Sequence, residues 1–130
     1  DLNLCTAIRS TGSFIHVHVR MMPKQEPPYT RLMESVNRQP EHHYDYLNGT
    51  IVGFFTPELF HGVGSAGFHL HFVDQDRTVG GHILGFELER GSVEISDAET
   101  FEQHFPTKDE AFLEADIDYE NIDEEIRMAE

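Results

Sequence analysis

The sequence is poor in cysteine, in basic residues and in long apolar runs. Its single cysteine, Cys5, cannot form a disulfide within the chain, which favours a reducing compartment. No stretch approaches the ~20 apolar residues that span a bilayer, and no basic segment followed by an apolar run marks a signal peptide. We therefore expect no membrane partner and a cytoplasmic location.

Basic residues number only 9, against 24 acidic residues, and the formal net charge is −15. The acidic excess is concentrated from Glu94 onward, where Lys108 and Arg127 are the basic residues. Such a surface repels phosphate backbones, so nucleic acid is not an expected partner. We interpret the acidic stretch mainly as solvated helix faces, with a dedicated interaction tail as the alternative.

The 130 residues, 38% of them hydrophobic, suffice for one domain with its own core. Alternating patterns bounded by turn signals predict strands over residues 2–8, 13–21, 43–47, 50–55, 67–74, 78–88 and 92–95. Turns are expected at 9–12, at Asn48-Gly49 and at 89–91. Helical patterns cover residues 29–39, 97–104, 108–115 and 121–129.

These patterns predict an α+β fold. We expect a mixed, largely antiparallel sheet of five or more strands, a few short helices, and a C-terminal tail that packs back on the sheet. Residues 1–95 would form the metal-binding β-sheet domain. Residues 96–130 would be an acidic helical segment and tail of the same domain.

Three histidines near the middle of the chain are the strongest candidate site. His69 and His71 are two residues apart within 67–74, so on a strand their side chains share a face. A reversal at Asp76-Arg77 places His82 directly opposite His71, with Cβ atoms roughly 5 Å apart. Three imidazoles then converge on one metal ion and leave a coordination position open, as catalytic metal sites do. Zinc, iron, nickel, copper and cobalt all accept such ligands.

Other polar residues are weaker candidates. His16 and His18 also share a strand face, but no third partner lies at hairpin spacing, so we interpret them as half-exposed strand residues. Arg20, on the same polar face, has two interpretations: a clamp for the carboxylate of an anionic substrate, or a surface salt bridge. The remaining histidines are expected in loops or at helix ends, facing solvent: His42, His43, His61 and His104.

Three segments resemble the α-acetolactate decarboxylase family, and the resemblance extends over essentially the whole chain. They are GFHLHFVDQDRTVGGHIL at 67–84, VRMMPKQEPPY at 19–29 and GTIVGFFTP at 49–57. The histidine segment, combined with the Arg-x-x-Pro-Lys-Gln segment at its distance, is highly specific. The resemblance implies that the three histidines bind Zn²⁺, or another divalent transition metal, and that Arg20 lines the active site.

A glutamate of the family's C-terminal tail reaches the metal, and the resemblance makes Glu130 the candidate here. Glu124 and Glu125 are the alternatives. The implied reaction converts 2-acetolactate, a hydroxy-keto acid, into acetoin and carbon dioxide through a zinc-stabilised enediolate. Arg20 would orient the carboxylate, and Glu130 would deliver a proton.

The resemblance also implies a homodimer and a longer protein. The chain starts at Asp1 rather than Met, and it resembles the C-terminal half of the family protein. The N-terminal half, which contributes a further active-site glutamate, is missing, so this fragment alone could be inactive.

Two functions from other classes stay open. Cupin-like metal oxygenases also carry His-x-His on a strand, but they place a glutamate three or four residues further on, where this chain has Asp76 after a four-residue gap. A non-catalytic domain that stores metal or binds a partner would use the acidic tail and would not need Arg20.

Overall fold

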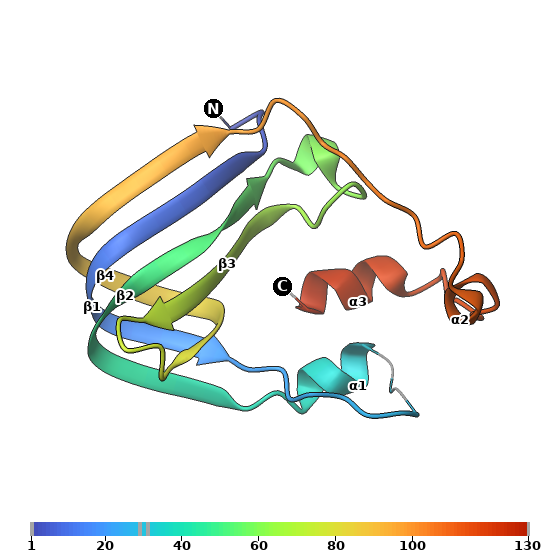
Figure 1. Ribbon diagram of the computed structural model, residues 1–130, viewed down its shortest axis with the longest axis horizontal. Helices are drawn as coiled ribbons and strands as arrows, with labels where there is room; N and C mark the ends of the chain where they lie inside the picture. The colour runs from blue at the N-terminus through green and yellow to red at the C-terminus, as the bar shows by residue number, and fades with distance from the viewer. Residues whose placement is uncertain (1, 29, 31, 130) are drawn as a thin grey trace.

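The computed structural model describes residues 2–28, 30 and 32–129. In chain order, its elements are β1 (Thr6–Arg20), α1 (Leu32–Asn37), β2 (Glu41–Thr56), the 3-10 helix η1 (Glu58–Phe60), β3 (Gly67–Asp74), β4 (Gly80–Asp97), α2 (Glu110–Leu113) and α3 (Ile122–Ala129). The strands form one side of the molecule, and the three α-helices lie on the other (Figure 1).

The described strands form a single antiparallel sheet that closes on itself. β1 pairs with both β2 and β4, β2 pairs with β3, and β3 pairs with β4. The pairings of β1 run along its whole length, whereas β3 and β4 share only the pairs 71–82, 72–81 and 73–80. The prediction of a mixed sheet with five or more strands is therefore wrong, because the sheet has four strands and every pairing is antiparallel.

The reason is that the expected turns lie inside long strands. Gly12 of β1 stands opposite Gly49 of β2 and Gly91 of β4, and these strands bend midway along their length (Figure 1). A Cβ atom on Gly12 would lie 2.2 Å from the Arg90 carbonyl oxygen, and one on Gly91 would lie 2.4 Å from the Thr11 oxygen. Glycine thus permits a close approach of neighbouring backbones where the sheet bends. The turn signals mark bends, and segments predicted as separate strands are halves of one strand.

A small apolar core holds the sheet together. Its buried members come from β1, β2 and β3: Phe14, Val17, Val19, Ile51 and Phe72. The rings of Phe14 and Phe72 meet edge to face with centroids 5.3 Å apart, a geometry that aromatic pairs prefer. Because strand side chains alternate, Phe72 occupies the core face of β3 and leaves His71 on the other face.

The helices largely follow the sequence pattern but are shorter than expected. α1, α2 and α3 fall within the predicted helical ranges, whereas residues 98–104 are not helical. At the start of α2, Asp109 accepts a hydrogen bond from the Phe112 N–H at 3.1 Å, the contact typical of an N-cap. Among the described residues, no helix has the length and apolar character needed to cross a membrane.

Helix α3 brings the C-terminal segment back to the sheet. In Figure 1 it lies between the two arms of the bent strands, and it contacts α1. The Ala129 carbonyl at its end accepts a hydrogen bond from Arg20, the last residue of β1. The chain therefore returns, after more than a hundred residues, to the end of its first strand.

Candidate metal centre

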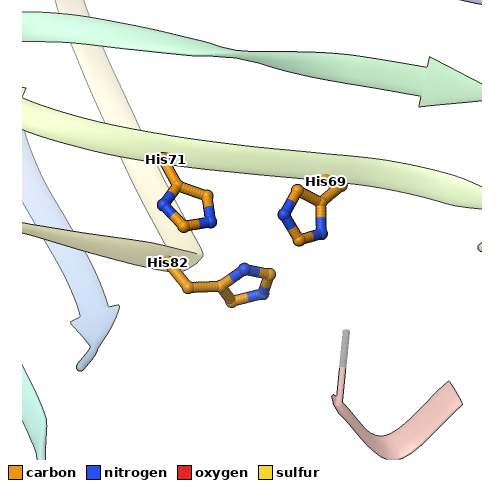
Figure 2. A group of neighbouring side chains, drawn as sticks. All are labelled: His69, His71 and His82. Atoms are coloured by element: carbon orange, nitrogen blue, oxygen red, sulfur yellow. The ribbon is translucent and has the colours of Figure 1, made fainter. Parts of the chain in front are cut away.

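The three histidines singled out in the sequence come together. His69 and His71 extend from β3 and His82 extends from β4, with their rings turned toward one another (Figure 2). One ring nitrogen of each lies within 4.8 Å of the other two. The predicted register is confirmed, since His71 pairs with His82 across β3 and β4.

The donor set fits a single transition-metal ion. Bonds of about 2.0–2.1 Å to a shared ion require nitrogens no more than ~4.2 Å apart, so the rings need only small rotations. Their centroids are 5.0 to 5.4 Å apart, and His69 and His82 are half-buried while His71 is exposed. Within residues 2–28, 30 and 32–129, this is the one group of three or more ligating side chains with such spacing.

Two apolar residues of β2 lie beside the histidines on the same face of the sheet. Val52 and Phe54 of β2 stand directly opposite His71 and His69, and directly opposed side chains share a face. The histidines therefore have hydrocarbon rather than charged groups beside them on β2.

Arg20 lies at the end of β1, directly opposite His82 of β4. Its side chain is buried, with 9% of the residue exposed. The Nη2 group donates a hydrogen bond to the Ala129 carbonyl oxygen. Arg20 is therefore an interior residue between the histidine strand and the end of α3, rather than a surface residue.

The predicted glutamate, Glu130, lies outside the described residues. The alternatives, Glu124 and Glu125, lie in the first turn of α3, where Glu124 is exposed and Glu125 is half-buried. At the opposite end of the same helix, Ala129 is the residue that meets Arg20. The described part of α3 thus places its last residue, not its first turn, beside the predicted arginine.

Two polar contacts link α3 to the segment that contains η1. Asp123 lies 3.6 Å from the Nε2 atom of His61, and Arg127 lies 3.6 Å from Glu58. His61 directly follows η1, in the loop where the sequence predicts it, but the prediction that it faces solvent is wrong, because its side chain is only 17% exposed. Together with the Arg20 hydrogen bond, these contacts involve both ends of α3.

The rival histidines form a separate cluster on β1 and β2. The Nδ1 atom of His16 lies 2.8 Å from Asp45, and the Nε2 atom of His18 lies 2.9 Å from Glu41. His43 stacks on His18 with ring centroids 3.9 Å apart. The side chains of His16 and His18 are 37% and 24% exposed, as expected for half-exposed strand residues.

The prediction that His42 and His43 lie in loops or at helix ends is wrong, because both lie in β2. The sequence did not reveal their pairing with β1, since residues 42–43 and 18–19 are joined by a long connection rather than a tight turn. Partners joined by a long connection can be identified only when the register of the two strands is known.

Sequence reasoning also missed Asp74, the last residue of β3, where the turn to β4 begins. Its buried carboxylate accepts hydrogen bonds from the N–H groups of Thr78 and Val79 at 2.7 and 2.8 Å. These bonds, chiefly the one from Val79, hold the pKa of the Asp74 carboxyl below its ordinary value. An aspartate at the start of a turn is a recognisable signal for such local bonding.

Comparison with known proteins shows the family to which the chain belongs. The profile of the family described as alpha-acetolactate decarboxylase matches residues 1–119, most of the chain. The chain belongs to this family.

Two relatives show how far the likeness extends. The alpha-acetolactate decarboxylase of Lactococcus lactis subsp. lactis is 46% identical over 128 residues, which make up 98% of this chain and 54% of the relative. That of Bacillus licheniformis is 39% identical over 128 residues, 98% of this chain and 50% of the relative. The chain thus spans about half the length of these alpha-acetolactate decarboxylases.

Solved structures share the fold. A Staphylococcus aureus protein described as similar to alpha-acetolactate decarboxylase superposes with a TM-score of 0.93 at 58% identity, over 100% of this chain and 56% of that one. The acetolactate decarboxylase of Bacillus subtilis subspecies spizizenii gives a TM-score of 0.91 at 37% identity, over 100% and 56%.

Proposed function

We propose that this chain carries the metal-binding part of an active site that converts 2-acetolactate into acetoin and carbon dioxide. The observation that carries the proposal is the convergence of His69, His71 and His82, with one ring nitrogen of each within 4.8 Å of the others. The names of the relatives supply the substrate, because they are called alpha-acetolactate decarboxylases.

The three imidazoles would hold a divalent transition-metal ion, with Zn²⁺ as our first choice among the ions that accept nitrogen ligands. When bound, such an ion would serve as a Lewis acid that polarises oxygen atoms of the substrate, an effect worth several kcal/mol of barrier lowering. The exposed His71 and the half-buried His69 and His82 leave the centre open to a small molecule.

Arg20 would hold the carboxylate that leaves. Its guanidinium is buried opposite His82, and the planar fork of an arginine pairs with a carboxylate through two parallel hydrogen bonds. In the reaction, the bond between the carboxylate and the neighbouring carbon breaks, and carbon dioxide departs. The electron pair of that bond passes to the adjoining carbonyl, and protonation of the carbon completes acetoin.

We assign delivery of that proton to Glu130. Glu130 itself lies outside the described residues, and its support comes from its neighbour in the sequence, Ala129, which accepts a hydrogen bond from Arg20. Glu124 and Glu125 are less well supported because they lie in the first turn of α3, at the other end of the helix.

The test measures acetoin released from 2-acetolactate without oxygen, using the complete polypeptide that carries this chain. The unaltered protein should form acetoin, lose the activity on chelation and regain it with Zn²⁺. His71→Ala should be inactive, whereas His104→Ala should be unaffected, because His104 is an exposed tail residue paired with Glu102. Acetoin formation that survives His71→Ala, or a product formed only with oxygen, would refute the proposal and favour the oxygenase alternative.

A further inference from the structure

The register that brings His82 to His71 is supported by very few residue pairs. β3 and β4 pair only at 71–82, 72–81 and 73–80, and two of these pairs involve the glycines Gly80 and Gly81. Glycine-rich strands specify their register weakly, and a slip of one residue turns every side chain to the opposite face. A slip here would turn His82 away from His71.

The two glycines cannot be exchanged for residues that would fix the register. A Cβ atom on Gly81 would lie 2.7 Å from the Arg20 carbonyl oxygen, and one on Gly80 would lie 2.9 Å from the Phe72 oxygen. Side chains at these positions would collide with the backbones of β1 and β3. Besides the pairing of β4 with β1, the element that can set how β4 enters against β3 is the adjoining turn.

That turn is organised around one carboxylate. Both oxygens of Asp74 are used: Oδ1 accepts from the N–H groups of Thr78 and Val79, and Oδ2 accepts from the Thr78 hydroxyl at 2.8 Å. The backbone of Asp74 adds two contacts, because its N–H donates to the Val79 carbonyl at 3.0 Å and its carbonyl accepts from the Arg77 N–H at 3.1 Å. Arg77, which lies in this turn, has a positive φ of 57°.

The turn is anchored to the rest of the sheet as well. Gln75 donates its N–H to the Asn48 carbonyl of β2 at 2.9 Å, and Asp74 itself pairs with Gly49. The Asp74 end of the turn is therefore fixed on β2, and its carboxylate determines where residues 78 and 79 must lie. β4 begins at the next residue, Gly80.

We infer that Asp74 is a positioning residue for the metal centre, because it fixes the length of the β3–β4 turn and thereby sets His82 opposite His71. The inference rests on the proposed metal centre for its functional consequence. Asp74 does not act on the substrate. It acts through the backbone of the turn, so its loss should appear in the geometry of the histidines before it appears in the global fold.

The first measurement is zinc affinity by chelator competition, on samples whose circular dichroism shows them to be folded. Asp74→Ala should bind zinc about tenfold more weakly or worse, the usual cost of losing a residue that orients a metal site. Asp74→Asn should bind zinc a few-fold more weakly than the parent, because its amide oxygen still accepts from the N–H groups of Thr78 and Val79 but its amide nitrogen cannot accept from the Thr78 hydroxyl. Asp76→Ala is the matched control, an exposed aspartate of the same turn, and should keep the parent affinity.

The second measurement needs no metal. Nuclear Overhauser contacts between residues 71 and 82 in the metal-free protein should be present in the parent and in Asp76→Ala, and weak or absent in Asp74→Ala. Unchanged contacts or unchanged zinc affinity in Asp74→Ala would overturn the inference. Should the alanine variant fail to fold, Asp74→Asn is compared with Asp76→Asn, and equal affinities would overturn it in the same way.

The two proposals fail separately. A parent protein that binds zinc but releases no acetoin would overturn the decarboxylase proposal, while the zinc and contact comparisons would still support the role of Asp74. A parent protein that makes acetoin, with full zinc affinity retained in Asp74→Ala, would overturn only the role of Asp74.

Discussion

Under the proposed function, Arg20 would serve two roles that one buried guanidinium can fill together. It donates from Nη2 to the Ala129 carbonyl, yet an arginine has five N–H donors in a fixed planar arrangement. One contact with α3 therefore leaves donors for a carboxylate. Its position opposite His82 sets those donors on the face of the candidate metal centre.

Replacing Arg20 with lysine tests the carboxylate clamp. Arg20→Lys keeps the positive charge but loses the planar fork, so we expect zinc content to be retained while turnover of 2-acetolactate falls about a hundredfold, the cost of a misplaced reacting group. Steady-state kinetics with metal analysis measures both. Arg9→Lys is the control, since Arg9 is exposed and paired with Glu94. Equal kinetics for the two variants would show that Arg20 does not hold the substrate.

The residue identities of the histidine site could be predicted because the information is local. The spacing of His69 and His71 sets their common face, and the short turn after Asp74 sets their distance to His82. The partners of His16 and His18 could not be predicted in this way. They lie on β2, and their identity depends on the register of strands separated by a long connection.

At the level of elements, the glycines have a different meaning from the one their local sequence suggests. Asn48-Gly49 is a strong hairpin signal, yet both residues continue β2. Whether the chain reverses or only bends at a glycine depends on the neighbouring strand. Here Gly49 and Gly91 both stand opposite the same residue, Gly12 of β1. Sequence patterns therefore located the strand segments but divided three strands in two.

The bend can be tested at Gly12. A Cβ atom there would lie 2.2 Å from the Arg90 carbonyl oxygen, so Gly12→Ala must push two backbones apart. We expect a loss of about 1–3 kcal/mol in the free energy of unfolding, as for other overpacked sites. Gly85→Ala is the matched control, because nothing lies within 4 Å of its added carbon. Urea denaturation that gave equal stabilities for the two variants would contradict this account of the bend.

The β3–β4 turn should respond to acid. The pKa of Asp74 is lower in the folded protein than in the unfolded chain, chiefly because of the Val79 N–H. Its charged form therefore stabilises the fold above the unfolded value of ~3.9, and this contribution is lost as the pH falls below that value through the folded pKa.

We accordingly expect Asp74→Ala to make the free energy of unfolding less dependent on pH below about pH 4. Urea denaturation at a series of acidic pH values measures the slope. Asp76→Ala serves as the comparison from the same turn. If Asp74→Ala kept the slope of the parent, the carboxylate could not be holding the turn.

Over the whole molecule, the folding core and the candidate metal centre use opposite faces of the same strand. Phe72 packs in the core with Phe14 and Ile51, whereas His69 and His71 alternate with it on the other face of β3. The candidate metal ligands are thus not needed to fill the core, so we expect the metal-free protein to fold. Helix α3 contacts this arrangement through the hydrogen bond of Arg20 to Ala129 and lies near His61 and Glu58.

The most direct test of the central claim is the amount of zinc bound per chain, measured by mass spectrometry after metal-free protein is loaded with zinc and dialysed. The unaltered protein should retain close to one zinc ion per chain, and His71→Ala should retain almost none. His16→Ala, which alters the separate cluster on β1 and β2, should bind as the parent does. Failure of the parent to retain zinc, or full retention by His71→Ala, would contradict the account.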